Sequence, residues 1–128
     1  MTAANPERGE VEIELGGKAY PMRPSYRALK EIEATTGRPI MGLLLDGREG
    51  GFRVSDLAAV VTAGIQEAGR SRNDSMLKGV NVEKIGELIY EQGLYEAAGP
   101  VVEFLINACE GGAKPATGKK KAEPSGKA

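Results

Sequence analysis

Three glutamates on alternate residues, Glu10, Glu12 and Glu14, form the most regular group of candidate metal ligands in the chain. Carboxylate oxygens in this number could hold a hard cation such as Ca²⁺ or Mg²⁺. Side chains on one face of a strand, however, follow one another at about 6–7 Å, which is too far apart for one small ion. We therefore interpret the three carboxylates as the solvated face of a strand, where charged residues usually lie.

Two other groups could act on a substrate. Arg70 and Arg72 could clamp a phosphate between their guanidinium groups, but we interpret them as part of a solvated polar loop over residues 70–80. Glu33 is one of two carboxylates on the first expected helix and borders either the core or a partner-binding groove. Nothing near it marks a sugar or phosphate substrate for hydrolysis by paired carboxylates.

The chain contains no histidine, which removes the commonest general base and metal ligand. Ser-His-Asp and Cys-His catalysis within the chain are thereby excluded. Its single cysteine, Cys109, has no basic neighbour in sequence, and we interpret it as a small core residue rather than a nucleophile. Gly118-Lys119 resembles part of a phosphate loop, but the glycine spacing and the preceding strand are missing. The sequence therefore predicts no enzymatic activity, no catalytic residue, no cofactor and no metal site.

Charge is divided unevenly along the 128 residues. Residues 1–110 carry 12 Lys and Arg against 17 Asp and Glu, a net charge of −5, whereas residues 111–128 carry five Lys against one Glu, a net charge of +4. The acidic body argues against a nucleic-acid partner, because each phosphate contact needs a cation. No apolar run approaches the roughly 20 residues that span a bilayer, and the N-terminus lacks a signal peptide. We therefore expect a cytoplasmic protein with no membrane partner.

A β-hairpin is predicted over residues 10–23. Apolar residues alternate with glutamates before Gly16-Gly17, a pair that can adopt the positive φ angles of a two-residue turn. This turn sets the register, in which Leu15 faces Lys18, Ile13 faces Tyr20, Val11 faces Met22 and Glu10 faces Arg23. Because a lone hairpin is only marginally stable, its apolar face must lie on helices.

After the hairpin, apolar residues recur at helical spacing over most of the remaining chain. Helices are predicted over residues 25–36, 39–45, 55–69, 81–93 and 94–109, with a kink or break at Pro100. We expect Ser25, Ser55 and Asn81 to cap helices and Gly37 and Gly69 to end them. The fold class is α+β, predominantly helical, with an N-terminal β-hairpin packed on four to five short helices. Residues 1–9 are expected to be a flexible N-terminus, 10–110 a single globular domain, and 111–128 a disordered Lys-rich tail.

The order of these motifs along the chain resembles that of a known protein family. The chain reads Tyr20-x-Met22-Arg23-Pro24-Ser25-Tyr26, then Leu29-x-x-Ile32-Glu33-x-x-Thr36-Gly37, and later Asp56-Leu57-Ala58-x-Val60, Ile85-Gly86, Gly93-Leu94 and Glu103-Phe104-Leu105. Over about residues 8–108 it resembles the gene transfer agent family of phage-type tail assembly chaperones, also described as tail tube proteins of gene transfer agents.

The resemblance implies a non-enzymatic role in a bacterial host cell. A tail assembly chaperone binds the aggregation-prone, helical tape measure protein and assists tail tube proteins to polymerise around it. Two alternatives stay open: a structural tail tube or tail-completion subunit of the particle, and a small regulatory protein whose basic tail binds nucleic acid. The oligomeric state and the choice between a prophage and a gene transfer agent also stay open.

A partner-binding surface is predicted where the hairpin meets the first helix, at Tyr20, Met22, Tyr26 and Leu29. Tyrosine and methionine are enriched in adaptable interfaces. The alternative is that these four side chains form only the internal seam between the hairpin and the helix.

Overall fold

The computed structural model describes residues 4–112. They form a 3-10 turn, two strands and six helices, in the order η1 (Pro6–Arg8), β1 (Val11–Leu15), β2 (Lys18–Met22), α1 (Tyr26–Thr36), α2 (Ile40–Arg48), α3 (Val54–Arg72), α4 (Ser75–Lys78), α5 (Val82–Gln92) and α6 (Leu94–Cys109). The predicted α+β fold, predominantly helical with an N-terminal hairpin, is confirmed. The tail expected over residues 111–128 lies outside the described residues from position 113 onward.

The hairpin has the predicted register. Val11 pairs with Met22, Ile13 with Tyr20 and Leu15 with Lys18. Gly16 and Gly17 have φ angles of 59° and 77°, so both turn positions use the conformation that glycine adopts without strain. The three apolar residues of β1 are buried, while the glutamates between them are exposed. One face of the two-stranded sheet therefore lies on the helices, as its alternating pattern requires.

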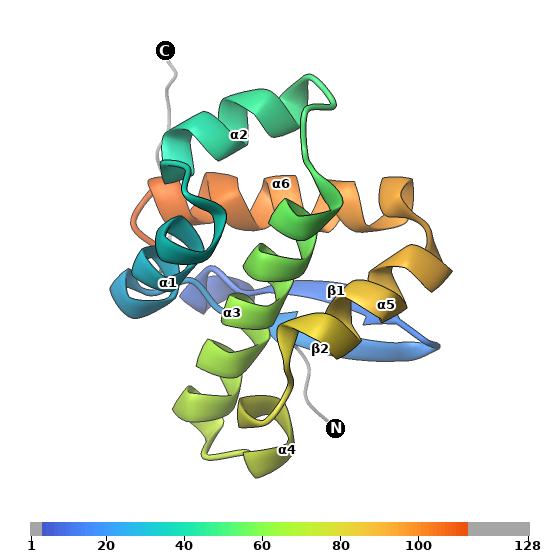
Figure 1. Ribbon diagram of the computed structural model, residues 1–128. Coiled ribbons are helices and arrows are strands. Elements are labelled where there is room, and N and C mark those ends of the chain that lie inside the picture. The colour runs from blue at the N-terminus through green and yellow to red at the C-terminus, as the bar shows by residue number, and fades with distance from the viewer. Residues whose placement is uncertain (1–3, 113–128) are drawn as a thin grey trace.

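Helix α3 is the centre of the molecule (Figure 1). It crosses the hairpin and packs against β2, α1, α4, α5 and α6. Gly64, in the middle of α3, allows the closest approach, because a Cβ there would lie 2.8 Å from the Met22 Cβ and 3.1 Å from Phe104 Cε1. The backbone N–H of Arg23 donates to the Gly64 carbonyl at 2.9 Å, which joins the end of β2 to the helix. The core lies around this contact.

Several helix boundaries differ from those predicted. Helix α3 begins at Val54, with Arg53 rather than Ser55 at the N-cap, and it continues through Gly69 to Arg72. The predicted loop over residues 70–80 contains the end of α3 and the short helix α4. Gly69 lies inside α3 instead of ending it. Its missing side chain lets α4 approach closely, because a Cβ there would lie 2.6 Å from the backbone nitrogen of Lys78.

Helices α2 and α6 also differ from expectation. Helix α2 extends to Arg48, beyond the predicted helix end at residue 45. Phe52 folds back over this last turn, since a Cβ on Gly47 would lie 2.2 Å from its ring. Helix α6 continues through Pro100 without division. Gly99 has no Cβ to clash with the proline ring, which relieves the usual restriction on the residue before proline.

Glu10 corrects the expectation of a solvated glutamate face. Its side chain is fully buried, whereas Glu12 and Glu14 are exposed. Its carboxylate accepts hydrogen bonds from Arg72 at 2.7 and 3.1 Å and from the backbone N–H of Asn5 at 2.7 Å. Arg23, its predicted cross-strand partner, lies 3.9 Å away.

The residues just before the hairpin are ordered around η1, although we expected them in a flexible N-terminus. Asn5 and Gly9 cap the two ends of η1. Gly9 is buried, and its carbonyl accepts a hydrogen bond from the Asn107 side chain.

Candidate functional site

Several large apolar side chains remain exposed on the surface of the described part of the molecule. The described residues that share this property are Tyr26, Met41, Leu45, Val54, Met76, Val82, Tyr90, Leu94 and Tyr95. Some of them line hollows between helices, and exposed apolar side chains that gather in this way commonly mark interaction sites. The first hollow lies between α1, α2 and α6, and the second lies between α3 and α5.

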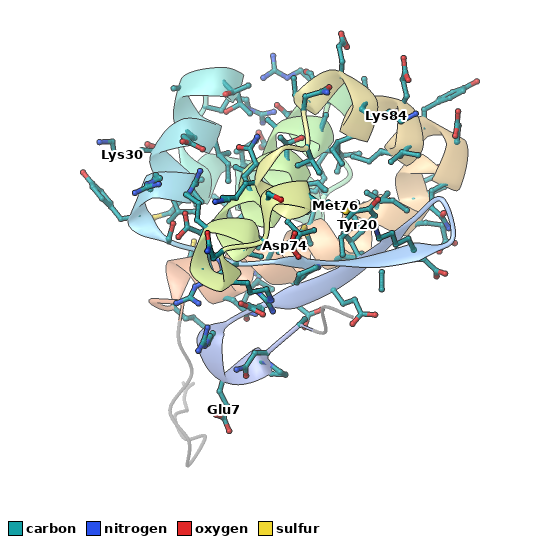
Figure 2. The ribbon with its side chains drawn as sticks, turned by 90° about the horizontal axis from the view of Figure 1, so that it is seen from below. Glu7, Tyr20, Lys30, Asp74, Met76 and Lys84 are labelled. Atoms are coloured by element: carbon teal, nitrogen blue, oxygen red, sulfur yellow. The ribbon has the colours of Figure 1, made fainter. Side chains whose placement is uncertain are left out.

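The α1–α6 surface is a hollow of about 440 Å³. Its apolar lining consists of Tyr26, Leu29, Pro39, Ile40, Met41, Ala108 and Cys109. A smaller hollow of about 240 Å³ adjoins it and shares Tyr26 and Leu29. Lys30 and Glu33 are the charged residues of the larger hollow, and Lys30 extends from the outer side of α1 in Figure 2. This surface combines an apolar floor with a sparse charged rim.

Local hydrogen bonds fix the helices that form this surface. Ser25 caps α1 by accepting a hydrogen bond from the backbone N–H of Ala28 at 3.0 Å, so Tyr26 is the first helical residue and projects outward. Pro39 stands at the N-cap of α2 but has no side-chain acceptor. The Glu33 carboxylate supplies one, because it accepts the backbone N–H of Ile40 at 2.9 Å. Glu33 therefore joins α1 to the start of α2 and also lines the α1–α6 surface.

The four residues of the predicted partner surface are divided between the core and the exterior. Met22 is fully buried, and Tyr20 is half-buried on the hairpin, where it packs against the core (Figure 2). Leu29 is also half-buried, but it lines the α1–α6 surface together with Tyr26, which is 79% exposed. The structure thus brings Tyr26 and Leu29 together on one surface and leaves Met22 no solvent-exposed area.

The other residues with candidate chemistry have structural partners. Arg70 lies in the last turn of α3 and donates to the Glu67 carboxylate at 2.9 and 3.0 Å, while Arg72 donates to Glu10. Neither residue belongs to a solvated loop, which corrects that interpretation. Cys109 is exposed rather than a core residue, because it is the last residue of α6 and lies at the rim beside α1 and α2. Burial of part of the thiol and the nearby Glu110 raise its pKa.

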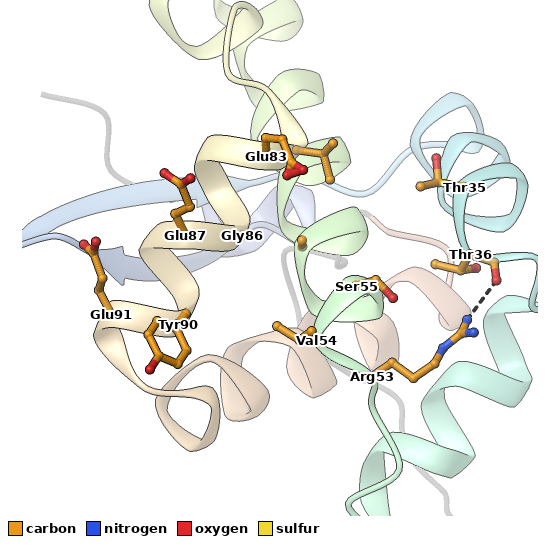
Figure 3. A pocket seen from close by; sticks show the side chains of 12 residues that line it. Thr35, Thr36, Arg53, Val54, Ser55, Glu83, Gly86, Glu87, Tyr90 and Glu91 are labelled. Carbon is orange, nitrogen blue, oxygen red and sulfur yellow. Dashed lines mark hydrogen bonds between the residues drawn. The ribbon is translucent and has the colours of Figure 1, made fainter.

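A second hollow, which we call the α3–α5 groove, was not predicted from the sequence. It measures about 620 Å³, and its apolar lining comes from Val54 and Ala58 on α3 and from Val82 and Tyr90 on α5. Figure 3 shows three carboxylates, Glu83, Glu87 and Glu91, along α5 beside it. The signal in the sequence is the spacing: apolar or small residues at 82, 86 and 90 run parallel to glutamates at 83, 87 and 91.

A buried carboxylate holds one end of this groove. The Asp56 side chain is fully buried and accepts from the backbone N–H of Arg53 at 2.8 Å, from the Arg53 guanidinium and from Arg38 at 2.6 Å. Arg38 also pairs with Asp46 of α2. Arg53 in turn donates to the Thr36 carbonyl at 2.9 Å (Figure 3). Burial alone would raise the pKa of Asp56, but the hydrogen bonds from Arg53 and the charges of Arg38 and Arg53 together lower it.

The lowered pKa of Asp56 makes stability depend on pH. Its folded-state pKa lies below the unfolded value of about 3.9, so its contribution is complete above that value and is lost as the pH falls through the folded pKa. We therefore expect the Asp56→Asn variant to be less stable than the wild type at pH 7. The difference should begin to shrink below about pH 4, where the Asp56 carboxyl of the unfolded chain becomes protonated while that of the folded protein is still ionised. Urea unfolding of both proteins from pH 7 to pH 3 measures this, and a constant difference would contradict it.

Neither hollow contains a recognisable set of reacting groups. Within residues 4–112, no cluster of His, Cys, Asp and Glu is arranged to hold a metal ion. Among the described helices, none has both the length and the apolar composition needed to cross a membrane. The structure does contain apolar hollows between short helices. These features are those of the class of small, mostly helical proteins with surfaces for binding a partner.

The comparison with protein families identifies the group within that class. The sequence profile of the family described as phage tail tube protein, GTA-gp10, matches residues 8–111. The chain belongs to this phage tail tube and tail assembly chaperone family, whose members are tail structural or assembly proteins and generally not enzymes. Comparisons with curated proteins and with solved structures gave no match. The resemblance noted in the sequence is thereby confirmed.

Proposed function

We propose that this protein is a tail assembly chaperone that binds the tape measure protein and assists tail tube assembly in a gene transfer agent or prophage. Family membership supports a role in tail assembly. The observation that carries the chaperone role is the sheet: among the described residues it has only two strands. A tube wall built by strand pairing between neighbouring subunits needs more extended sheets with open edges.

The alternative role is a structural tail tube or tail-completion subunit, and the family's own description as a tail tube protein favours it. The two roles differ in what the finished particle contains. A chaperone should be absent from purified particles, whereas a tube subunit should be present in many copies. Quantitative mass spectrometry of purified particles distinguishes them directly.

The α1–α6 surface is our proposed site for the tape measure protein. An amphipathic helix can place its apolar side chains in a groove of this kind and leave its polar face in water. Tyr26 and Met41 are 79% and 71% exposed, so both are available to a partner. Leu29 lies between the exterior and the core and would support the bound helix from below. Met22 is fully buried against Gly64 of α3, so it cannot contact a partner directly.

Co-expression with the tape measure protein tests this proposal. We expect the double variant Tyr26→Ser/Met41→Ser to reduce the soluble fraction of the tape measure protein several-fold, because the exposed apolar anchors of the interface are lost. The variant itself should keep its stability within about 0.5 kcal/mol, since both side chains are on the surface. Soluble yield is measured by sedimentation of the lysate and quantitative blotting.

Tyr95→Ser is the matched control. Tyr95 is 97% exposed and lies at the start of α6, outside the lining of the α1–α6 surface. It should leave the yield of soluble tape measure protein unchanged. If the double variant keeps the tape measure protein as soluble as the wild type does, the interface lies on another face.

A further inference from the structure

We propose that the α3–α5 groove binds an amphipathic helix that carries a row of Lys or Arg along one side. This surface is formed by other residues than the α1–α6 surface. The inference therefore goes beyond the proposed binding of the tape measure protein and does not depend on it. It rests on three features of the groove: its apolar floor, its acidic wall and its length.

The floor of the groove is apolar and contains a gap. On α5, Val82, Gly86 and Tyr90 follow one another at four-residue spacing and lie on one side of the helix. Val82 is 43% exposed and Tyr90 is 76% exposed, although both line the groove. Gly86 faces Ala58 of α3, and a Cβ there would lie 3.5 Å from the Ala58 Cβ, an ordinary contact. The absence of a side chain at Gly86 is therefore not needed for packing, and it leaves the floor open.

The wall of the groove is acidic. Glu83, Glu87 and Glu91 are exposed and occupy the row next to the apolar one. Figure 3 shows Glu83 extending toward α3, while Glu87 and Glu91 project from the outer side of α5, away from Val54 and Ser55 on α3. Lys84 is the only basic residue of α5, so the helix carries a net negative charge. A basic row on the partner complements this wall, whereas an acidic one would be repelled.

The dimensions favour a helix as the occupant. Helix α5 has 11 residues, which corresponds to about 16 Å. A partner helix of about three turns matches this length. Its apolar residues at i, i+3, i+4 and i+7 would fill the floor, and basic residues at four-residue spacing would lie opposite the three glutamates.

Two synthetic peptides test the inference against the full-length protein. Both are about 18 residues long, with leucines at helical spacing, and they differ only in a flanking row of Lys or of Glu. Fluorescence anisotropy of labelled peptides measures binding. We expect the Lys peptide to bind at least about tenfold more tightly than the Glu peptide, and its affinity to fall with added salt.

Two variants locate the binding site. Gly86→Leu fills the gap in the floor and should abolish binding of the Lys peptide while circular dichroism stays unchanged. The triple variant Glu83→Gln/Glu87→Gln/Glu91→Gln changes only exposed side chains, so it should fold, and it should weaken the Lys peptide about tenfold. The triple variant Glu12→Gln/Glu14→Gln/Glu103→Gln removes the same charge from exposed positions elsewhere, and it should change the affinity less than twofold.

Other results would overturn the inference. Equal binding of the two peptides, or equal losses in the two triple variants, would show that no basic helix is recognised at this groove. If Lys119→Gln/Lys120→Gln/Lys121→Gln in the full chain tightens peptide binding, the chain's own Lys-rich segment is the occupant instead. If the wild type is a dimer by sedimentation and Gly86→Leu is a monomer, the occupant is a second copy.

Discussion

Replacement of Arg72 by methionine is expected to lower the free energy of unfolding by about 3 kcal/mol, because it leaves the buried Glu10 carboxylate without its main counter-charge. Arg72 donates two hydrogen bonds to Glu10, and the Glu10 side chain has no exposed surface. Arg23, 3.9 Å from the carboxylate, compensates only in part. The loss should lower the melting temperature by about 10–20 °C in a domain of this size.

Chemical denaturation measures the effect, and two variants interpret it. Arg27→Met removes an arginine from the exposed side of α1 and should change stability by less than about 0.5 kcal/mol. The double variant Glu10→Leu/Arg72→Met removes both charges of the pair, so no buried carboxylate is left unpaired, and it should recover much of the lost stability. A single Arg72→Met variant as stable as the wild type would mean that Glu10 does not depend on this pair.

The Gly64→Ala variant is expected to lose about 2 kcal/mol of stability, although alanine favours helices. The added Cβ would lie 2.8 Å from the Met22 Cβ and 3.1 Å from the Phe104 ring, both in the core. To admit it, α3 must move away from β2, and this strains the hydrogen bond from Arg23 to the Gly64 carbonyl. Urea unfolding and the melting temperature measure the loss.

The matched control for Gly64→Ala is Gly86→Ala in α5. Its Cβ would meet only Ala58, at 3.5 Å, which is a normal contact. We expect Gly86→Ala to raise stability by about 0.5–1 kcal/mol, since a helix interior prefers alanine to glycine. The same substitution should therefore have opposite effects at two mid-helix glycines. A gain at both positions would contradict the close approach of β2 to α3.

Features that depend on neighbouring residues could be predicted from the sequence. The hairpin register follows from the Gly16-Gly17 turn and from the alternation before it, and both act within a few residues. Ser25 and Asn81 cap their helices as predicted, with acceptor distances of 3.0 and 2.8 Å, because capping is also local. These features explain why the fold class could be derived without a structure.

Features that depend on distant residues could not be predicted. Glu10 is buried because its partner Arg72 lies 62 positions later in the chain. Gly69 has the residue type that ends helices, but α4 packs against it and the helix continues. No property of a single segment distinguishes a glycine that ends a helix from one that allows another helix to approach.

The exposure of the residues proposed for the partner surface could be predicted only in part for the same reason. Met22 and Tyr26 stand four residues apart and have similar interface propensity, yet one is fully buried and the other is 79% exposed. Only the placement of α3 across the hairpin separates them, because Gly64 lies against Met22. The α3–α5 groove was missed because its two rows are meaningful only when α3 lies beside α5.

The position of Cys109 provides a spectroscopic reporter. It is the single cysteine of the chain, it is exposed, and it lies at the rim of the α1–α6 surface. A maleimide dye would therefore attach at one known site without any engineered cysteine. Because the pKa of this thiol is raised, labelling should proceed faster in mildly alkaline buffer than at neutral pH. A partner that docks beside the dye would change its emission, so association could be followed in real time with the native sequence.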